Sequence, residues 1–161
     1  MSDLFIDLLR EMTFAERQFE KALPRMARAA NSAPLRDALS HHGTAERSRQ
    51  ERLGEVFRLF GRRPRAETSS AILGLLQDCE EFLDAAIEPG PIQDAALIAC
   101  GQAAAHHRIS RYAALAAWAA ALGKPEAAGL LRRSLDEEKA LDERLAALAD
   151  LLLAPAALAP G

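Results

Sequence analysis

The sequence predicts an all-α protein. Apolar residues recur in steps of three and four along most of the chain, and no convincing stretch alternates with the period of two that marks a strand. Alanine and leucine dominate, and aromatic residues make up only 5% of the chain. Half of the 161 residues are hydrophobic, which is enough for one domain with a core of its own.

The first part of the chain is expected to form one helical hairpin. Its first helix begins at Ser2, which can serve as N-cap, and runs to about Ala30. Ser32 then caps a second helix, which continues to about Phe60. This helix stops at Gly61, because glycine tolerates the positive φ that a helix C-cap often needs.

The second part of the chain predicts a crossover and another hairpin. A long connection leads to Pro91 and contains a shorter helix near 68–87. A third long helix spans about 92–122, followed by a turn at 123–125 and a fourth helix that ends at about Leu153.

Two long hairpins joined by a long crossover indicate a ferritin-like four-helix bundle rather than a bundle with uniformly short loops. The short extra helix would lie in the crossover. We expect residues 1–153 to form this single domain, with an Ala/Pro-rich C-terminal tail at 154–161.

Charged residues interrupt the apolar stripe of each long helix near its middle, namely Glu16, Glu46, Arg49, Arg108 and Glu138. In an antiparallel hairpin, residues equidistant from the turn lie at the same height. Glu16 should therefore face Arg49, and Glu138 should face Arg108. A bidentate guanidinium offsets the burial cost of a carboxylate well. The spacing predicts buried Glu–Arg pairing at the centre of the bundle.

A metal centre is the competing interpretation. Di-iron and di-manganese bundles commonly use Glu-x-x-His on two of their helices, and this motif is absent from the sequence. We expect His42 and His106 to be hydrogen-bonded core or boundary imidazoles. Arg108 would also oppose a nearby dication. A rebuilt site would draw on carboxylates and imidazoles that can face inward, namely Glu16, His42, Glu46, His106 and Glu138.

The composition argues against several classes of partner. The net charge is −3 and no basic tract is present, so we expect no nucleic-acid partner. No apolar run approaches the length of about 20 residues that spans a bilayer, and no signal peptide is recognisable, so we expect a cytoplasmic protein without a membrane partner. Cys79 and Cys100 lack CxxC spacing and are interpreted as small buried hydrophobic residues. No nucleophile motif or phosphate-binding loop supports an enzyme.

Three segments, at 15–30, 94–99 and 135–145, resemble the YciF/YciE-like family of ferritin-like proteins. The similarity extends over roughly 4–148, nearly the whole chain. The family is associated with bacterial stress responses, and its typical members have a carboxylate cluster that looks like a metal site. The resemblance therefore implies a bacterial ferritin-like fold with a remnant of that cluster.

The resemblance implies that part of the family's cluster is kept. The kept positions are the first-helix glutamate, the second-helix histidine and the fourth-helix Glu-Glu-Lys with a following aspartate, namely Glu16, His42, Glu137, Glu138, Lys139 and Asp142.

The other positions of the family's cluster are replaced. The second-helix glutamate falls on Ala45 and the glutamine after it on Arg49, while the third-helix Glu-x-x-Glu falls on Ala105 and Arg108. The two arginines can supply positive charge in place of a metal.

These observations predict a non-catalytic protein with a degenerate di-metal site and no cofactor, in a stress-associated structural or interaction role. A homodimer is the default assembly. The alternative is an iron- or manganese-binding protein with a reduced or histidine-rearranged site. The residues that could remain of a metal site are acidic or imidazole side chains, namely Glu16, His42, Glu46, Glu138 and Asp142.

Overall fold

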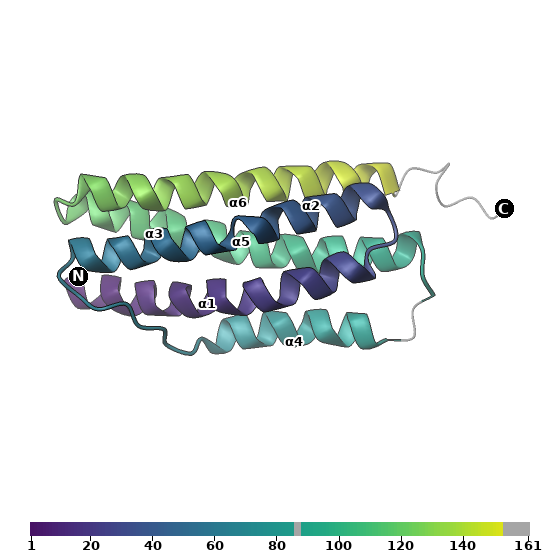
Figure 1. The fold of residues 1–161 in the computed structure, drawn as a ribbon, viewed down its shortest axis with the longest axis horizontal. Coiled ribbons are helices and arrows are strands. Elements are labelled where there is room, and N and C mark those ends of the chain that lie inside the picture. Colours follow the sequence, from purple (N-terminus) through teal and green to yellow (C-terminus); the bar gives the residue numbers. More distant parts are fainter. Residues whose placement is uncertain (86–87, 153–161) are drawn as a thin grey trace.

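The computed structural model describes residues 1–85 and 88–152, and this part of the chain folds into helices joined by turns and loops (Figure 1). The all-α prediction is therefore confirmed. The expected end of the crossover helix at Ile87 and the expected tail at 154–161 lie outside the described residues. The helices are α1 (Ser2–Ala29), α2 (Ala33–Thr44), α3 (Glu46–Leu59), α4 (Ser70–Asp84), α5 (Pro91–Ala121) and α6 (Pro125–Leu152).

The helices form two antiparallel groups that pack side by side (Figure 1). In the first group, α1 runs in one direction, and α2 and α3 run in the opposite direction. In the second group, α5 and α6 likewise run in opposite directions. The segment after α3 runs back along α1, where the Glu67 amide donates a hydrogen bond to the Arg10 carbonyl at 3.1 Å. This segment leads into α4, which packs against α1 and α5.

The prediction of one continuous second helix is wrong at Ala45. This residue ends α2 and precedes α3, and its amide donates to the His42 carbonyl three residues back, at 3.1 Å. The Arg49 guanidinium also donates to that carbonyl, at 2.8 Å. A side chain inserted into the helical hydrogen-bond ladder is a recognised cause of a helix break, so the break follows from a contact that helical periodicity does not encode.

The N-cap residues predicted for α1 and α2 are confirmed only in part. Ser2 lies inside α1 with Met1 at the N-cap position, so the predicted Ser2 cap is wrong. Ser32 does occupy the N-cap position of α2, but its side chain makes no capping bond. Its amide instead donates to the buried carboxylate of Asp94 at 2.8 Å, and the Asn31 amide donates to the same carboxylate at 2.7 Å. Asp94 thereby ties the α1–α2 turn to the start of α5.

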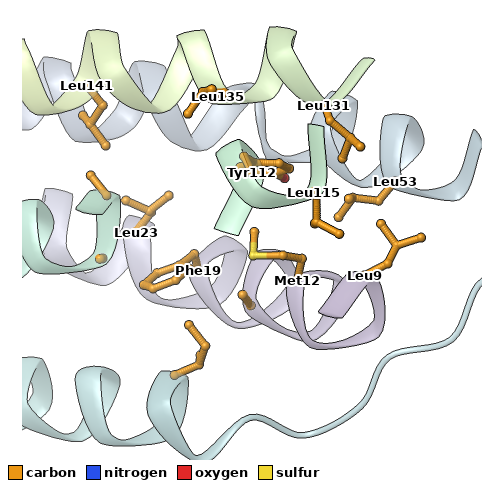
Figure 2. Close-up of a cluster of buried hydrophobic side chains, with 14 of the residues drawn as sticks. Leu9, Met12, Phe19, Leu23, Leu53, Tyr112, Leu115, Leu131, Leu135 and Leu141 are labelled. Atoms are coloured by element: carbon orange, nitrogen blue, oxygen red, sulfur yellow. The ribbon is translucent and has the colours of Figure 1, made fainter. Parts of the chain in front are cut away.

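The apolar stripes of the long helices meet in the interior (Figure 2). Full burial of one such side chain contributes about 1.5–3 kcal/mol, so this packing fixes the height of each helix relative to its neighbours. Within the described residues, no helix is long and apolar enough to cross a membrane. The buried side chains that Figure 2 labels come from α1, α3, α5 and α6, namely Leu9, Met12, Phe19, Leu23, Leu53, Tyr112, Leu115, Leu131, Leu135 and Leu141.

Candidate functional site

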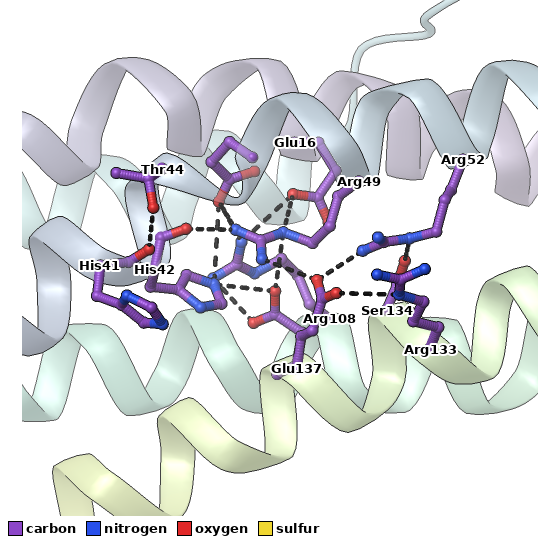
Figure 3. Close-up of polar contacts among 12 residues, drawn as sticks. Glu16, His41, His42, Thr44, Arg49, Arg52, Arg108, Arg133, Ser134 and Glu137 are labelled. Atoms are coloured by element: carbon purple, nitrogen blue, oxygen red, sulfur yellow. Dashed lines mark hydrogen bonds and ion pairs between the residues drawn. The ribbon is translucent and has the colours of Figure 1, made fainter.

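The charged residues that interrupt the apolar stripes meet in one buried cluster (Figure 3). Arg49 comes from α3 and Arg108 from α5. Around them lie Glu16 from α1, Glu46 from the first turn of α3 and Glu138 from α6. None of these five residues is more than 1% exposed. The helices therefore bring three acidic and two basic side chains together out of reach of water.

Arg49 contacts all three acidic residues. Its Nη2 lies 2.7 Å from Glu46 Oε1, and its Nε lies 3.5 Å from both Glu16 Oε2 and Glu138 Oε1. The same Nη2 donates to the carbonyl of His42. One guanidinium thus joins α1, α2, α3 and α6.

Arg108 approaches the same three acidic side chains from α5. Its Nη1 lies 3.0 Å from Glu46 Oε1 and 3.4 Å from Glu16 Oε2, and its Nη2 lies 3.0 Å from Glu138 Oε2. The guanidinium carbon stands 4.4 Å from the centre of the Phe19 ring, a distance at which the ring face attracts a cation. Both pairs expected from the hairpin geometry are in contact, and each arginine also contacts the other acidic groups.

Tyr112 and His42 supply neutral polar groups to the cluster. The Tyr112 hydroxyl donates to Glu16 Oε1 at 2.6 Å, and burial together with the nearby Glu16 carboxylate raises the pKa of this phenol. His42 Nε2 lies 3.0 Å from Glu138 Oε1. Burial lowers the pKa of His42, because a charged imidazole would lose hydration there. Both side chains are therefore uncharged at neutral pH.

Glu16 and Glu46 have opposite protonation behaviour. Burial alone would raise the pKa of Glu16, but a hydrogen bond with Glu46 and the charges of Arg108 and Arg49 outweigh it and lower that pKa to about 2. Burial and the Glu16 carboxylate raise the pKa of Glu46 to about 9. Glu46 Oε1 faces both arginines, which leaves Oε2 to carry the proton. With Glu46 protonated, two guanidiniums balance the carboxylates of Glu16 and Glu138.

A second layer of polar contacts covers the cluster on the α6 side. Glu137 Oε2 accepts from Arg49 Nη1 at 3.2 Å and from Arg52 Nη2 at 2.5 Å, and Arg52 Nε donates to Ser134 Oγ at 2.9 Å. Glu137, one of the positions that the resemblance implies are kept, therefore borders the cluster, with its side chain 29% exposed. Sequence reasoning missed Arg52, although its position three residues after Arg49 places both on one side of α3.

Asp142 lies outside the buried cluster, although it was a candidate for the remnant site. Its carboxylate contacts His106 Nε2 at 3.0 Å and accepts from Gln102 Nε2 at 3.2 Å. The His106 side chain is 66% exposed, so the expectation of a core or boundary imidazole is wrong for His106. The rearranged site that would have used His106 is not assembled here.

The cluster does not fit a metal ion. Apart from Glu46 Oε2, the oxygens that could act as ligands already face donors: Glu16 accepts from Tyr112, and all three acidic residues pair with Arg49 and Arg108. Guanidiniums stay protonated in proteins and would repel a dication among them. Within residues 1–85 and 88–152, no group of three or more His, Cys, Asp or Glu side chains is arranged to hold a metal.

A pocket of about 290 Å³ opens beside the cluster, between α2, α3 and α6. Ala38, Ala45 and Ala140 form part of its wall, and the buried His42 and Arg49 reach it from the cluster. The space adjoins the helix break, where the side chain of Ala45 is short.

Comparisons with known proteins find relatives of this chain. The model of the family described as Domain of unknown function (DUF892) matches residues 1–157. Protein YciF of Escherichia coli K12 is 35% identical over 150 residues, which cover 92% of this chain and 90% of that protein.

Two solved structures are similar in both fold and sequence. The crystal structure of the E. coli stress protein YciF matches with a TM-score of 0.91 and 34% identity, over 96% of this chain and 97% of that one. YcfI of Rhodopseudomonas palustris matches with a TM-score of 0.87 and 36% identity, over 91% of this chain and 92% of that one.

Proposed function

This chain belongs to the DUF892 family, and on that premise we propose that it is a non-catalytic, ferritin-like bundle protein in which buried Glu–Arg pairing has replaced a di-metal carboxylate site. YciF is named a stress protein, and YcfI is described provisionally as a structural protein. We extend a stress-associated structural or interaction role to this chain. It acts in the bacterial cytoplasm as a homodimer, without nucleic-acid or membrane partners.

The observation that carries this proposal is the position of the two arginines. Arg49 and Arg108 stand between Glu16, Glu46 and Glu138. Burial alone would lower the pKa of both guanidiniums. The surrounding carboxylates have the larger effect and raise the pKa of both. They supply fixed positive charge among the acidic side chains, but a guanidinium offers neither an open coordination position nor a redox couple.

The helix arrangement supports the ferritin-like part of the proposal. The α5–α6 turn is short, whereas the connection from α3 to α5 is long and contains α4. One long crossover between two antiparallel hairpins is typical of ferritin-like folds. In this arrangement the four long segments direct their central side chains to a common point, which is where the charged cluster lies.

Metal content tests the proposal. The protein would be expressed with added iron and manganese and analysed for both elements, beside the variant Glu16→Ala. We expect substoichiometric metal that the substitution does not change, because the acidic oxygens already face arginines. About one or two metals per chain, lost in Glu16→Ala, would overturn the proposal and favour the iron- or manganese-binding alternative.

Restoring the ligand set that the family resemblance implies should create metal binding. The variant combines Ala45→Glu, Arg49→Gln, Ala105→Glu and Arg108→Glu, which removes both cations and adds three carboxylates. The pocket beside Ala45 leaves room for the longer side chain. We expect this variant to bind one or two manganese or iron ions per chain, measured by elemental analysis after dialysis.

The matched control for this variant carries Gln in place of Glu at the three new acidic positions. It has closely similar side-chain volume and lacks the added carboxylates, so we expect no gain in metal. Equal metal content in the two folded variants would contradict the assignment of these positions to a former metal site.

A further inference from the structure

The pocket between α2, α3 and α6 has the size of a site for a small molecule. Its volume is about 290 Å³, close to the range of about 300–1,000 Å³ that is usual for such sites. It adjoins the junction at Ala45, where α2 ends and α3 begins. The helix break and the short side chains around it leave this space beside the Glu–Arg cluster.

The walls of the pocket are largely apolar. Ala38 comes from α2, Ala140 and Leu141 come from α6, and Ala45 lies at the helix junction. Ala38 and Leu141 are buried. Apolar walls favour an occupant whose own apolar surface leaves water on binding. These walls therefore suit a compact hydrocarbon body, such as a short chain or a single ring.

The exposure of the lining residues shows where the pocket opens. His42 is 6% exposed and Arg49 is 0% exposed, so these two side chains form the inner end of the pocket. His41 and Arg144 are exposed and mark its mouth. The His41 ring points away from the ion pairs of the cluster (Figure 3). A ligand that enters the pocket therefore meets His41 and Arg144 first.

The charges around the pocket are unequally paired. Glu137 is the acidic residue of its wall, and its carboxylate already accepts hydrogen bonds from Arg49 and Arg52. Arg144 forms no ion pair with any residue in the described part of the chain. The mouth therefore offers a guanidinium that can donate two parallel hydrogen bonds to a carboxylate, and the His41 imidazole can donate a further one.

We propose that this pocket binds a small organic monocarboxylate with a compact apolar body. The carboxylate meets Arg144 and His41 at the mouth, and the body lies against the alanines and Leu141. A single negative charge fits best, because a second charge deeper in the pocket would approach Glu137. This inference goes beyond the proposed function and does not depend on it, since neither Arg144 nor His41 contacts the buried glutamates.

The test uses benzoate, a carboxylate on a single ring, titrated into the full-length, isotope-labelled protein at constant ionic strength. The amide shifts in proton–nitrogen NMR spectra should saturate with a Kd of about 1 mM. The largest shifts should fall within residues 38–45 and 137–144, which contain most of the pocket lining. Benzamide has nearly the same shape without the charge, and it should bind about fivefold more weakly.

The variant Arg144→Gln tests the origin of this preference for a charged probe. Because Arg144 is exposed, the substitution should leave the fold intact. Benzoate should bind about fivefold more weakly to this variant than to the wild-type protein, whereas benzamide should bind equally well to both. Ala140→Leu places a larger side chain in the wall of the pocket and should weaken the binding of both probes.

The matched control is Arg132→Gln, which removes the same charge from an exposed position of α6 outside the pocket lining. This variant should bind both probes like the wild-type protein. Equal affinity of the wild-type protein for benzoate and benzamide would overturn the proposal. So would equal losses of benzoate affinity in Arg144→Gln and Arg132→Gln, or benzoate shifts centred away from the pocket.

Discussion

Replacing Arg108 with Met should lower the free energy of unfolding by about 3–5 kcal/mol. Met fills much of the same volume, so the loss reports mainly on the charge. Without Arg108, the buried Glu16 and Glu138 carboxylates share only the guanidinium of Arg49. Urea denaturation followed by circular dichroism measures the change. The matched control is Arg47→Met, whose side chain is 88% exposed and which should lose at most about 1 kcal/mol.

The double variant Arg108→Met with Glu138→Gln shows whether the two charges act as a pair. The double variant should lose less free energy of unfolding than the sum of the two single variants, by about 1–3 kcal/mol. The reason is that removing both charges leaves neither one unpaired. Strictly additive losses would contradict the coupling between Arg108 and Glu138.

Glu46→Gln should remove a loss of stability that the wild-type protein shows as the pH rises from about 4.5 to about 9. Glu46 has a folded-state pKa raised to about 9 from an ordinary value of 4.5. The contribution of Glu46 to the free energy of unfolding is therefore complete below about pH 4.5. It declines as the pH rises toward 9, by at most about 1.4 kcal/mol per pH unit. Gln imitates the protonated acid at every pH, so the free energy of unfolding of the variant should be flatter across this range.

The control for Glu46 is Glu16→Gln, because the pKa of Glu16 moves in the opposite direction. With a folded-state pKa lowered to about 2, the Glu16 carboxylate contributes stability above about 4.5, and this contribution declines as the pH falls toward 2. Because the Glu16 carboxylate also raises the pKa of Glu46, Glu16→Gln should in addition reduce the loss of stability between about pH 4.5 and 9. Urea midpoints at several pH values measure both changes. An unchanged slope between about pH 4.5 and 9 in Glu46→Gln would show that another group holds the proton.

The contacts that the sequence predicted well are those fixed by local geometry. The heights of Glu16 and Arg49 follow from their equal distance to the first turn, and those of Arg108 and Glu138 from the α5–α6 turn. These positions depend only on helical rise and on a short connection. Hairpin symmetry therefore indicated which charged residues would meet before any packing was known.

The features that the sequence did not predict depend on tertiary contacts. The break at Ala45 involves the Arg49 guanidinium on the His42 carbonyl. Periodicity finds the inward face of a helix, but it does not find which side chain bonds to a backbone atom.

The helix break at Ala45 has a consequence for how the cluster tolerates substitution. Arg49 neutralises acidic side chains and also donates to a main-chain carbonyl at the break. A single replacement of Arg49 by a residue without a donor would leave an unpaired carboxylate and an unbonded carbonyl at once. One side chain therefore couples the charge balance of the interior to the path of the main chain, and neither can be changed at Arg49 without the other.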